Sequence, residues 1–272
     1  DMSEMMMGEK REPKQVEKAA LPTTNPVLEI QGIHANKDNG LEAVSGVNLT
    51  VHSGEIVGIA GISGNGQREL VEVLAGQRPA TDGQMLVNGE VYSATRGQMY
   101  RHGVFALPEE PLRNACVAHM SVAENMALRT FDRPPQSKAG ILLVLQAIRQ
   151  MAVGLISQFS VKTPSAETPI GNLSGGNVQR AVLARELHSD RIKLLIAANP
   201  CFGLDFAAVE FIHTQIVEAR NRGVAVLLVS EDLDELLKLA DRILVISEGK
   251  FTYESAIADA DFATIGRSMA GH

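Results

Sequence analysis

The stretch Leu173-Ser174-Gly175-Gly176-Asn177-Val178-Gln179-Arg180 decides how the rest of the chain is interpreted. In it Ser174, a residue type that caps helices, precedes two glycines, which let backbone N–H groups approach a ligand closely. The first N–H groups of a helix lack intrahelical partners and lie at the positive end of its dipole, so they attract anions. As an isolated match, a flexible turn before a helix would be the commoner interpretation.

The residues after this octet favour a helix. An apolar face at helical spacing is formed by Val178, Ala181, Val182, Ala184 and Leu187. Arg180 and Arg185 lie off that face. The octet therefore reads as the start of an amphipathic helix with exposed amides.

Composition limits the function classes. The 272 residues fit one large domain with or without an appendage, and a net charge of -7 argues against a non-specific nucleic-acid binder. Two cysteines, Cys116 and Cys201, suggest a reducing compartment. The most apolar stretch, 139–156, is interrupted by polar residues and is too short to span a bilayer. With no signal peptide at its start, we expect a soluble or peripheral protein.

Residues 1–25 are expected to be a tail and linker, because they are Met-rich, then charged, then broken by prolines. Ser3-Glu4-Met5-Met6-Met7-Gly8 echoes Arg267-Ser268-Met269-Ala270-Gly271 near the other end. Such an echo suggests the second unit of a tandem, although one this short arises by chance as often as not.

The remaining chain predicts an α/β fold. We expect strands at 27–30, 47–51, 55–59, 84–87, 91–92, 104–107, 193–197, 224–229 and 242–246. Helices are expected at 67–75, 122–128, 141–159, 179–187, 207–220 and 232–239. The alternation after residue 193 indicates parallel strands with crossover helices. Residues 112 to about 190 carry no strand pattern and predict an inserted helical block.

A glycine-rich octet joins an expected strand to an expected helix. It reads Gly61-Ile62-Ser63-Gly64-Asn65-Gly66-Gln67-Arg68 and lies where a phosphate-binding Walker A loop belongs. Gln67 stands where the motif has a Lys, and this replacement removes a charge-assisted hydrogen bond worth about 1.5–3 kcal/mol. The motif's Ser or Thr is Arg68, which offers Mg²⁺ no hydroxyl oxygen. A glycine turn that packs a helix on a sheet is the alternative, at even odds on this octet alone.

Together these segments resemble the ordered motifs of ATP-binding cassette (ABC) ATPases, over about residues 27 to 272. The first octet resembles the signature motif, 194–200 the Walker B strand, Gly203-Leu204-Asp205 the D-loop and Pro108-Glu109-Glu110 the Q-loop. The resemblance implies a P-loop NTPase cassette over 26–272 with a RecA-like core, an antiparallel β subdomain and a helical subdomain at about 112–190.

The chain departs from the family at its hydrolytic residues. Ala198 and Asn199 replace the adjacent Asp and Glu of Walker B, Glu231 replaces the switch His and Glu109 replaces the Q-loop Gln. Alanine cannot hold the metal shell and asparagine is no base. No catalytic residue is therefore expected to be intact, and Mg²⁺ is not expected at the chain's own site.

The resemblance is closest to the second, C-terminal cassette of fused double-cassette ATPases that energise bacterial importers of sugars and nucleosides, with 195–200 and 228–236 favouring nucleoside importers. It implies that nucleotide is held weakly, or without hydrolysis, by Gly61, Ser63, Gly64, Asn65, Gly66, Gln67, Arg68 and Glu109. It also implies that the ATP site of a partner cassette is completed by Leu173, Ser174, Gly175, Gly176 and Asn177 of the signature segment and by Asp205 of the D-loop.

By the same resemblance the partners are the N-terminal cassette of the same subunit, transmembrane permease subunits and, indirectly, a solute-binding protein, with no nucleic acid. The location implied is peripheral, at the cytoplasmic face of the inner membrane. The apolar run 141–159 is expected to be subdomain core rather than a permease contact. Two other functions are considered: a self-sufficient NTPase, which would need Walker B carboxylates, and a non-transport or regulatory cassette, against which the acidic balance counts.

Overall fold

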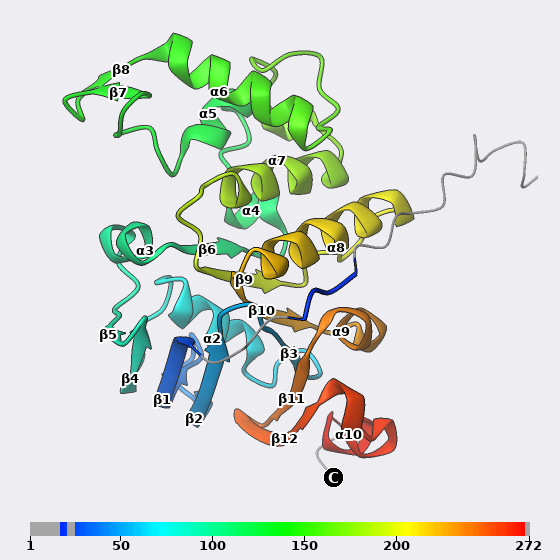
Figure 1. The fold of residues 1–272 in the computed structure, drawn as a ribbon. Helices are drawn as coiled ribbons and strands as arrows, with labels where there is room; N and C mark the ends of the chain where they lie inside the picture. The colour runs from blue at the N-terminus through cyan, green and yellow to red at the C-terminus, as the bar shows by residue number, and fades with distance from the viewer. Residues whose placement is uncertain (1–16, 21–24, 270–272) are drawn as a thin grey trace, which may run out of the picture.

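A six-stranded sheet forms the centre of the molecule in the computed structural model, which describes residues 17–20 and 25–269 (Figure 1). Its order is β12 (Lys250–Ala256), β11 (Arg242–Ser247), β3 (Ile56–Ala60), β10 (Ala225–Ser230), β9 (Leu194–Ala198) and β6 (Val104–Leu107). All its neighbours are parallel except β11 and β12. The expected parallel core is confirmed.

The two faces of this sheet carry separate apolar clusters. Every residue of β3, β9 and β10 is buried, as expected for parallel strands covered on both faces. In β9, Leu195 and Ala197 belong to one cluster, whereas Leu194 and Ile196 belong to the other. The first cluster includes residues of α7 (Gly175–Leu187), α8 (Phe206–Asn221), α9 (Leu233–Leu239) and α10 (Phe262–Met269); the second includes α2 (Gln67–Leu74).

A second, antiparallel sheet packs on the α2 side. Its order is β2 (Glu42–His52), β1 (Pro26–Asn36), β4 (Asp82–Val87) and β5 (Glu90–Val91). Apolar residues of β1 and β2 share the cluster of α2. The antiparallel subdomain is therefore confirmed, with β1 and β2 longer than expected because both strands continue across register shifts.

The helical subdomain lies beyond the β6 edge of the sheet (Figure 1). It contains α4 (Pro111–Asn114), α5 (Val122–Ala127), α6 (Leu145–Gln158), the short η1 (Ile170–Asn172) and α7. Buried residues of α5, α6 and α7 pack in the first cluster. The expected helical block is thus present.

The prediction for 141–159 is wrong at its start. A two-stranded hairpin, β7 (Ser137–Lys138) and β8 (Leu142–Leu143), precedes α6, because Ala139 and Gly140 adopt positive φ angles and turn the chain. The run is also not all core. Ile148, Ala152 and Leu155 are buried, but the hairpin's Ile141 is 83% exposed and Leu142, Leu143 and Leu145 are exposed as well.

Outside the helical block, four elements were not expected from the sequence: α3 (Arg96–His102), β12, the short η2 (Ile257–Asp259) and α10. The strand β12 alternates exposed and half-buried residues at the sheet edge, so its apolar signal is weak. Among the described residues, no helix combines the length and apolarity needed to cross a membrane.

Most of the expected N-terminal tail, and the whole of its echo segment at 3–8, lies outside the described residues. The four described residues at 17–20 have no secondary structure but do contact the core. Lys18 Nζ donates to the Ala240 carbonyl at 2.7 Å and pairs with Asp241 at 3.1 Å. Ala19 N donates to Asn221 Oδ1 at 3.0 Å. This short piece therefore lies against the end of α8 and the junction between α9 and β11.

Candidate functional site

The glycine loop 61–66 joins β3 directly to α2. Gly66 is the N-cap of α2 and has a φ of 104°, a left-handed conformation that favours glycine. A Cβ on Gly66 would collide with the carbonyl oxygen of Ala43, and one on Gly61 would lie 2.8 Å from the carbonyl oxygen of Ile246. The chain's own packing therefore requires both glycines.

Asn65 fastens this loop to the turn between β11 and β12. Gly249 N donates to the Asn65 carbonyl at 3.0 Å, and Glu248 N donates to Asn65 Oδ1 at 3.2 Å. The sequence reasoning missed this contact. Its signal is the turn at 248–249, where both residues adopt positive φ after a buried strand. Lys37 Nζ contributes a third restraint by donating to the Gly64 carbonyl at 3.2 Å.

Gln67 lies over the loop that it follows. Its side chain is buried, and Nε2 donates to the Ile62 carbonyl at 3.0 Å. Its Oε1 is buried and accepts no hydrogen bond within the described part of the chain. The amide thus occupies the loop's inner side, but it brings no positive charge there.

Arg68 turns away from the loop. It is 75% exposed, and its Nε donates to Glu72 Oε1 at 2.7 Å, one turn along α2. This hydrogen bond raises the pKa of Arg68 above its usual range. The geometry follows the rotation of about 100° between successive helical residues. The structure therefore places Ser63 and Gly64 on an exposed turn without a cation from α2 against them.

At the Walker B position, one residue has no polar side chain and the other forms hydrogen bonds with the backbone. Ala198 ends β9 and presents only a methyl group. Asn199 has a φ of 42°, its N–H donates to the Val229 carbonyl at 2.8 Å, and its Oδ1 accepts from Glu231 N at 2.9 Å. Because β9 and β10 are neighbours, Asn199 and Glu231 meet, and the amide binds the chain that would carry the switch residue.

Glu109 follows the end of β6 and is half-buried. Its carbonyl accepts a hydrogen bond from Asn114 Nδ2 at 2.7 Å, which closes the short α4 turn. In residues 17–20 and 25–269, no hydrogen bond connects Glu109 with the 61–68 segment. The structure therefore does not bring Glu109 together with the glycine loop by direct contact.

The signature segment begins α7. Ser174 is the N-cap, and its hydroxyl accepts from Asn177 Nδ2 at 2.8 Å, while Asn177 Oδ1 accepts from Lys162 N at 2.7 Å. The amides of Gly175 and Gly176 donate to no group in the described residues. Ser174 and Gly175 are exposed, so these donors face outward from the positive end of a 13-residue helix.

Within the described residues, no close contact requires glycine at these two positions. A Cβ on Gly175 would lie 4.0 Å from Leu204 Cδ2, and one on Gly176 would lie 3.4 Å from Ala208 Cβ, both ordinary contacts. Glycine inside a helix costs up to about 1 kcal/mol relative to alanine. The two glycines therefore reduce helix stability without a packing reason of their own, and they keep the backbone accessible.

The expected D-loop lies beside the signature segment. Asp205 caps α8, its Oδ1 accepting from Ala208 N at 2.9 Å. A hollow of about 420 Å³ is shared by the start of α7, α4 and the loop after β9, and includes Leu173, Gly175, Asn199 and Phe202. Phe202 and Phe206 are 70% and 73% exposed. The signature and D-loop segments thus form one continuous face.

The glycine loop and the signature segment are not brought together in the described structure. Helices α2 and α7 pack against opposite faces of the six-stranded sheet (Figure 1). No hydrogen bond joins 61–68 to 173–177 among the residues that the structure places. An anion bound by one segment is therefore not shared with the other by any direct contact in this chain.

Comparison with known proteins agrees with this architecture. The profile of the family described as ABC transporter matches residues 44–201, more than half of the chain. The chain is 40% identical to the glucose import ATP-binding protein TsgD13 of Haloferax volcanii, covering 100% of this chain and 49% of that protein. It is 36% identical to the guanosine import ATP-binding protein NupO of Bacillus subtilis, covering 100% of this chain and 53% of that protein. It spans about half the length of these curated relatives.

Solved structures share the fold. One is cbiO1 from Clostridium perfringens, part of the ABC transporter complex cbiONQ, with a TM-score of 0.68, 19% identity and coverage of 91% of this chain and 93% of that one. Another is the dimeric ATP-binding cassette MJ0796 bound to ADP and Pi, with a TM-score of 0.71, 19% identity and coverage of 85% and 98%. The chain therefore belongs to the ABC transporter family of ATP-binding cassettes.

Proposed function

We propose that this chain is a nucleotide-binding cassette of an importer for sugars or nucleosides, and that it works mainly by completing the ATP site of a partner cassette. Relatives at 40% and 36% identity are named as glucose and guanosine import ATP-binding proteins. A further relative, 40% identical over 86% of this chain, is named as a nucleoside import ATP-binding protein of Lactococcus lactis. These names support both solute classes equally.

The observation that carries the proposal is the start of α7. Gly175 and Gly176 present outward amides without partners in the described residues, at positions where the chain itself would accept a side chain. Oriented N–H donors at a helix start stabilise a transferring phosphoryl group. A γ-phosphate held by another cassette is the anion that this face fits.

The chain's own half-site supports the same division of labour. Gln67 brings no charge to the loop, Arg68 pairs with Glu72, and the end of β9 carries Ala198 and Asn199 instead of carboxylates. ATP at the loop 61–66 would therefore bind weakly or stay unhydrolysed, and without a protein-held Mg²⁺. The self-sufficient NTPase would need groups that this half-site lacks.

The partner in this proposal is the other cassette of the same subunit, which the relatives' roughly twofold greater length supports. The placement of this chain as the C-terminal cassette rests on the motif resemblance alone. Transmembrane permease subunits and, through them, a solute-binding protein would complete the importer. The cassette would then work as a peripheral component at the cytoplasmic face of the membrane.

The test compares Ser174→Arg with Gln67→Ala in the full double-cassette subunit assembled with its permease. We expect Ser174→Arg to reduce ATP turnover by about 100-fold or more, because it blocks donors that act on the transferring phosphate. Gln67→Ala should retain most of the turnover. Equal damage from both variants would contradict the proposed division of labour, and unchanged melting curves would exclude unfolding as the cause.

A further inference from the structure

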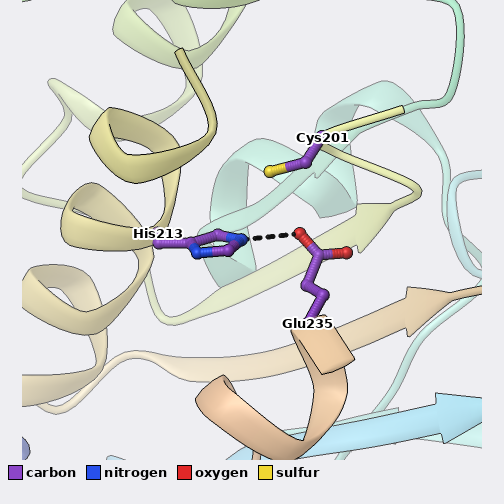
Figure 2. A group of neighbouring side chains, drawn as sticks. All are labelled: Cys201, His213 and Glu235. Atoms are coloured by element: carbon purple, nitrogen blue, oxygen red, sulfur yellow. Dashed lines mark hydrogen bonds and ion pairs between the residues drawn. The ribbon is translucent and has the colours of Figure 1, made fainter. Parts of the chain in front are cut away.

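Three side chains with metal-binding atoms meet where α8, α9 and the loop after β9 come together (Figure 2). Cys201 lies in the loop after β9, His213 on α8 and Glu235 on α9. One sulfur, one ring nitrogen and one carboxylate oxygen lie within 4.8 Å of one another. His213 and Glu235 are more than nine-tenths buried, and Cys201 is half-buried. No part of the nucleotide half-site or the signature segment uses them.

The hydrogen bonds within the cluster leave it incomplete. His213 Nε2 lies 3.0 Å from Glu235 Oε1, and Ser230 Oγ donates to Glu235 Oε2 at 2.7 Å. The other ring nitrogen, His213 Nδ1, is buried and has no partner in the part of the chain that the structure describes. Nε2, the ring nitrogen beside Glu235, is therefore the ligand atom available to an ion, and Nδ1 is left to carry the ring proton.

We propose that Cys201, His213 and Glu235 form a site for a zinc-class transition-metal ion. Thiolate, imidazole and carboxylate are the ligand types that Zn²⁺ takes in sites with three protein ligands and one open position. Their usual bond lengths imply ligand atoms about 3.4 to 3.6 Å apart in a tetrahedron. The three ligand atoms of the cluster lie within 4.8 Å of one another, so their widest separation would have to close by up to about 1.2 Å. The His213–Glu235 pair, now at 3.0 Å, would have to widen by about half an ångström.

The charges of the site also balance. Binding replaces the Cys201 thiol proton, which leaves as H⁺ when the sulfur–metal bond forms, and the proton of the neutral imidazole moves to Nδ1. Thiolate and carboxylate together cancel the two positive charges of the ion, which suits a buried site.

One member of the cluster, His213, also lines a cavity on the α8–α9 side. A cavity of about 150 Å³ borders His213 and is also lined by Glu210, Thr214 and Lys238. A metal bound behind it would connect α8, α9 and the loop after β9, the segments that carry Asp205, Glu231 and Asn199. The ion would therefore hold the signature-side face in one arrangement.

Cobalt titration of the full, untagged chain tests the site, since Co²⁺ substitutes for Zn²⁺ and its thiolate complexes absorb light. We expect one equivalent of Co²⁺ to produce thiolate-to-cobalt charge-transfer and tetrahedral ligand-field bands, and Zn²⁺ to abolish them. Cys201→Ser should lose the charge-transfer band. The matched control is Cys116→Ser: Cys116 is half-buried, with its pKa raised to about 11 by burial, and is in no such cluster among the described residues.

The same titration separates ligation from folding. His213→Gln should weaken cobalt binding by about tenfold or more while circular dichroism confirms a folded chain. A wild-type chain without the band, or a band that survives Cys201→Ser, would overturn the site. The measurement needs neither ATP nor a partner cassette, so its failure and a failure of the proposed import function are distinguishable.

Discussion

Two glycine-containing helix starts in this molecule face different requirements. At the start of α2, Gly61 and Gly66 are packed against the carbonyl oxygens of Ile246 and Ala43, so the chain itself requires them. At the start of α7, Gly175 and Gly176 have room for a side chain, yet their amides remain exposed. The first pair is explained by folding, and the second is not.

These two pairs of glycines show that a glycine motif in a sequence can have either of two explanations. A glycine that the surrounding backbone demands is explained by the fold alone, whatever side chains lie around it, as Gly61 and Gly66 illustrate. A glycine that the chain does not need, at an exposed helix start, indicates a requirement that comes from outside the chain.

The largest expected effect concerns the anchoring of α7. Glu186 is fully buried and binds Arg185 Nε at 2.7 Å and Arg129 NH2 at 2.9 Å. Glu186→Gln leaves these guanidinium groups without their carboxylate, so we expect the free energy of unfolding to fall by about 3 to 5 kcal/mol in urea titration. A loss below about 1 kcal/mol would show that α7 does not depend on this network.

The pH dependence of the same variant checks its cause. Burial raises the pKa of Glu186, but Arg185 and Arg129 outweigh burial, and the folded-state pKa lies below the usual range. A lowered pKa stabilises the folded state above the unfolded pKa, about 4.3, and this contribution is lost as pH falls toward the folded value. The difference between wild type and variant should therefore shrink in acid.

Gly66→Ala should have the next largest effect. Alanine at a φ of 104° is strained, and its Cβ would meet the Ala43 carbonyl, so we expect a loss of about 3 kcal/mol of stability by urea denaturation. The control is Gly64→Ala, which has a φ of 91° but no atom within 4 Å of the added Cβ. Equal losses from the two variants would mean that strain, and not close packing, sets the requirement.

Gly175→Ala should separate stability from function. The free energy of unfolding of the isolated chain should stay the same or rise by up to about 1 kcal/mol, because alanine favours the helix. The assembled double-cassette ATPase should slow by about tenfold, because the methyl group crowds an approaching phosphate. Reduced stability with normal turnover would mean that Gly175 is needed for folding and not for turnover, the opposite of what we expect.

Metal dependence should show the smallest change. Since Ala198 and Arg68 provide no ligand for Mg²⁺, ATP binding by the isolated chain should be essentially the same with Mg²⁺ and with a chelator, measured by calorimetry. The isolated chain should also hydrolyse ATP no faster than background. Strong Mg²⁺ dependence would sink the interpretation of the 61–68 segment as a degenerate half-site.

The sequence by itself determined the α/β class, the parallel core and the order of the motifs. Apolar runs such as 194–198 and 225–230 are local signals that a strand buried on both faces cannot avoid. It is likewise readable from residue types alone that Gln67, Ala198 and Asn199 carry neither an ammonium group nor a carboxylate.

Only the tertiary structure decided what the remaining groups do. No local pattern indicates that Asn65 binds the 248–249 turn, or that Asn199 holds the backbone of Glu231, since these contacts join strands that are neighbours in space and distant in sequence. The sequence did not predict the hairpin at 137–143, because its second strand belongs to an apolar run and its turn depends on two positive φ angles. Likewise, Cys201, His213 and Glu235 carry no recognisable spacing, and packing of α8 and α9 against one sheet face brings them together.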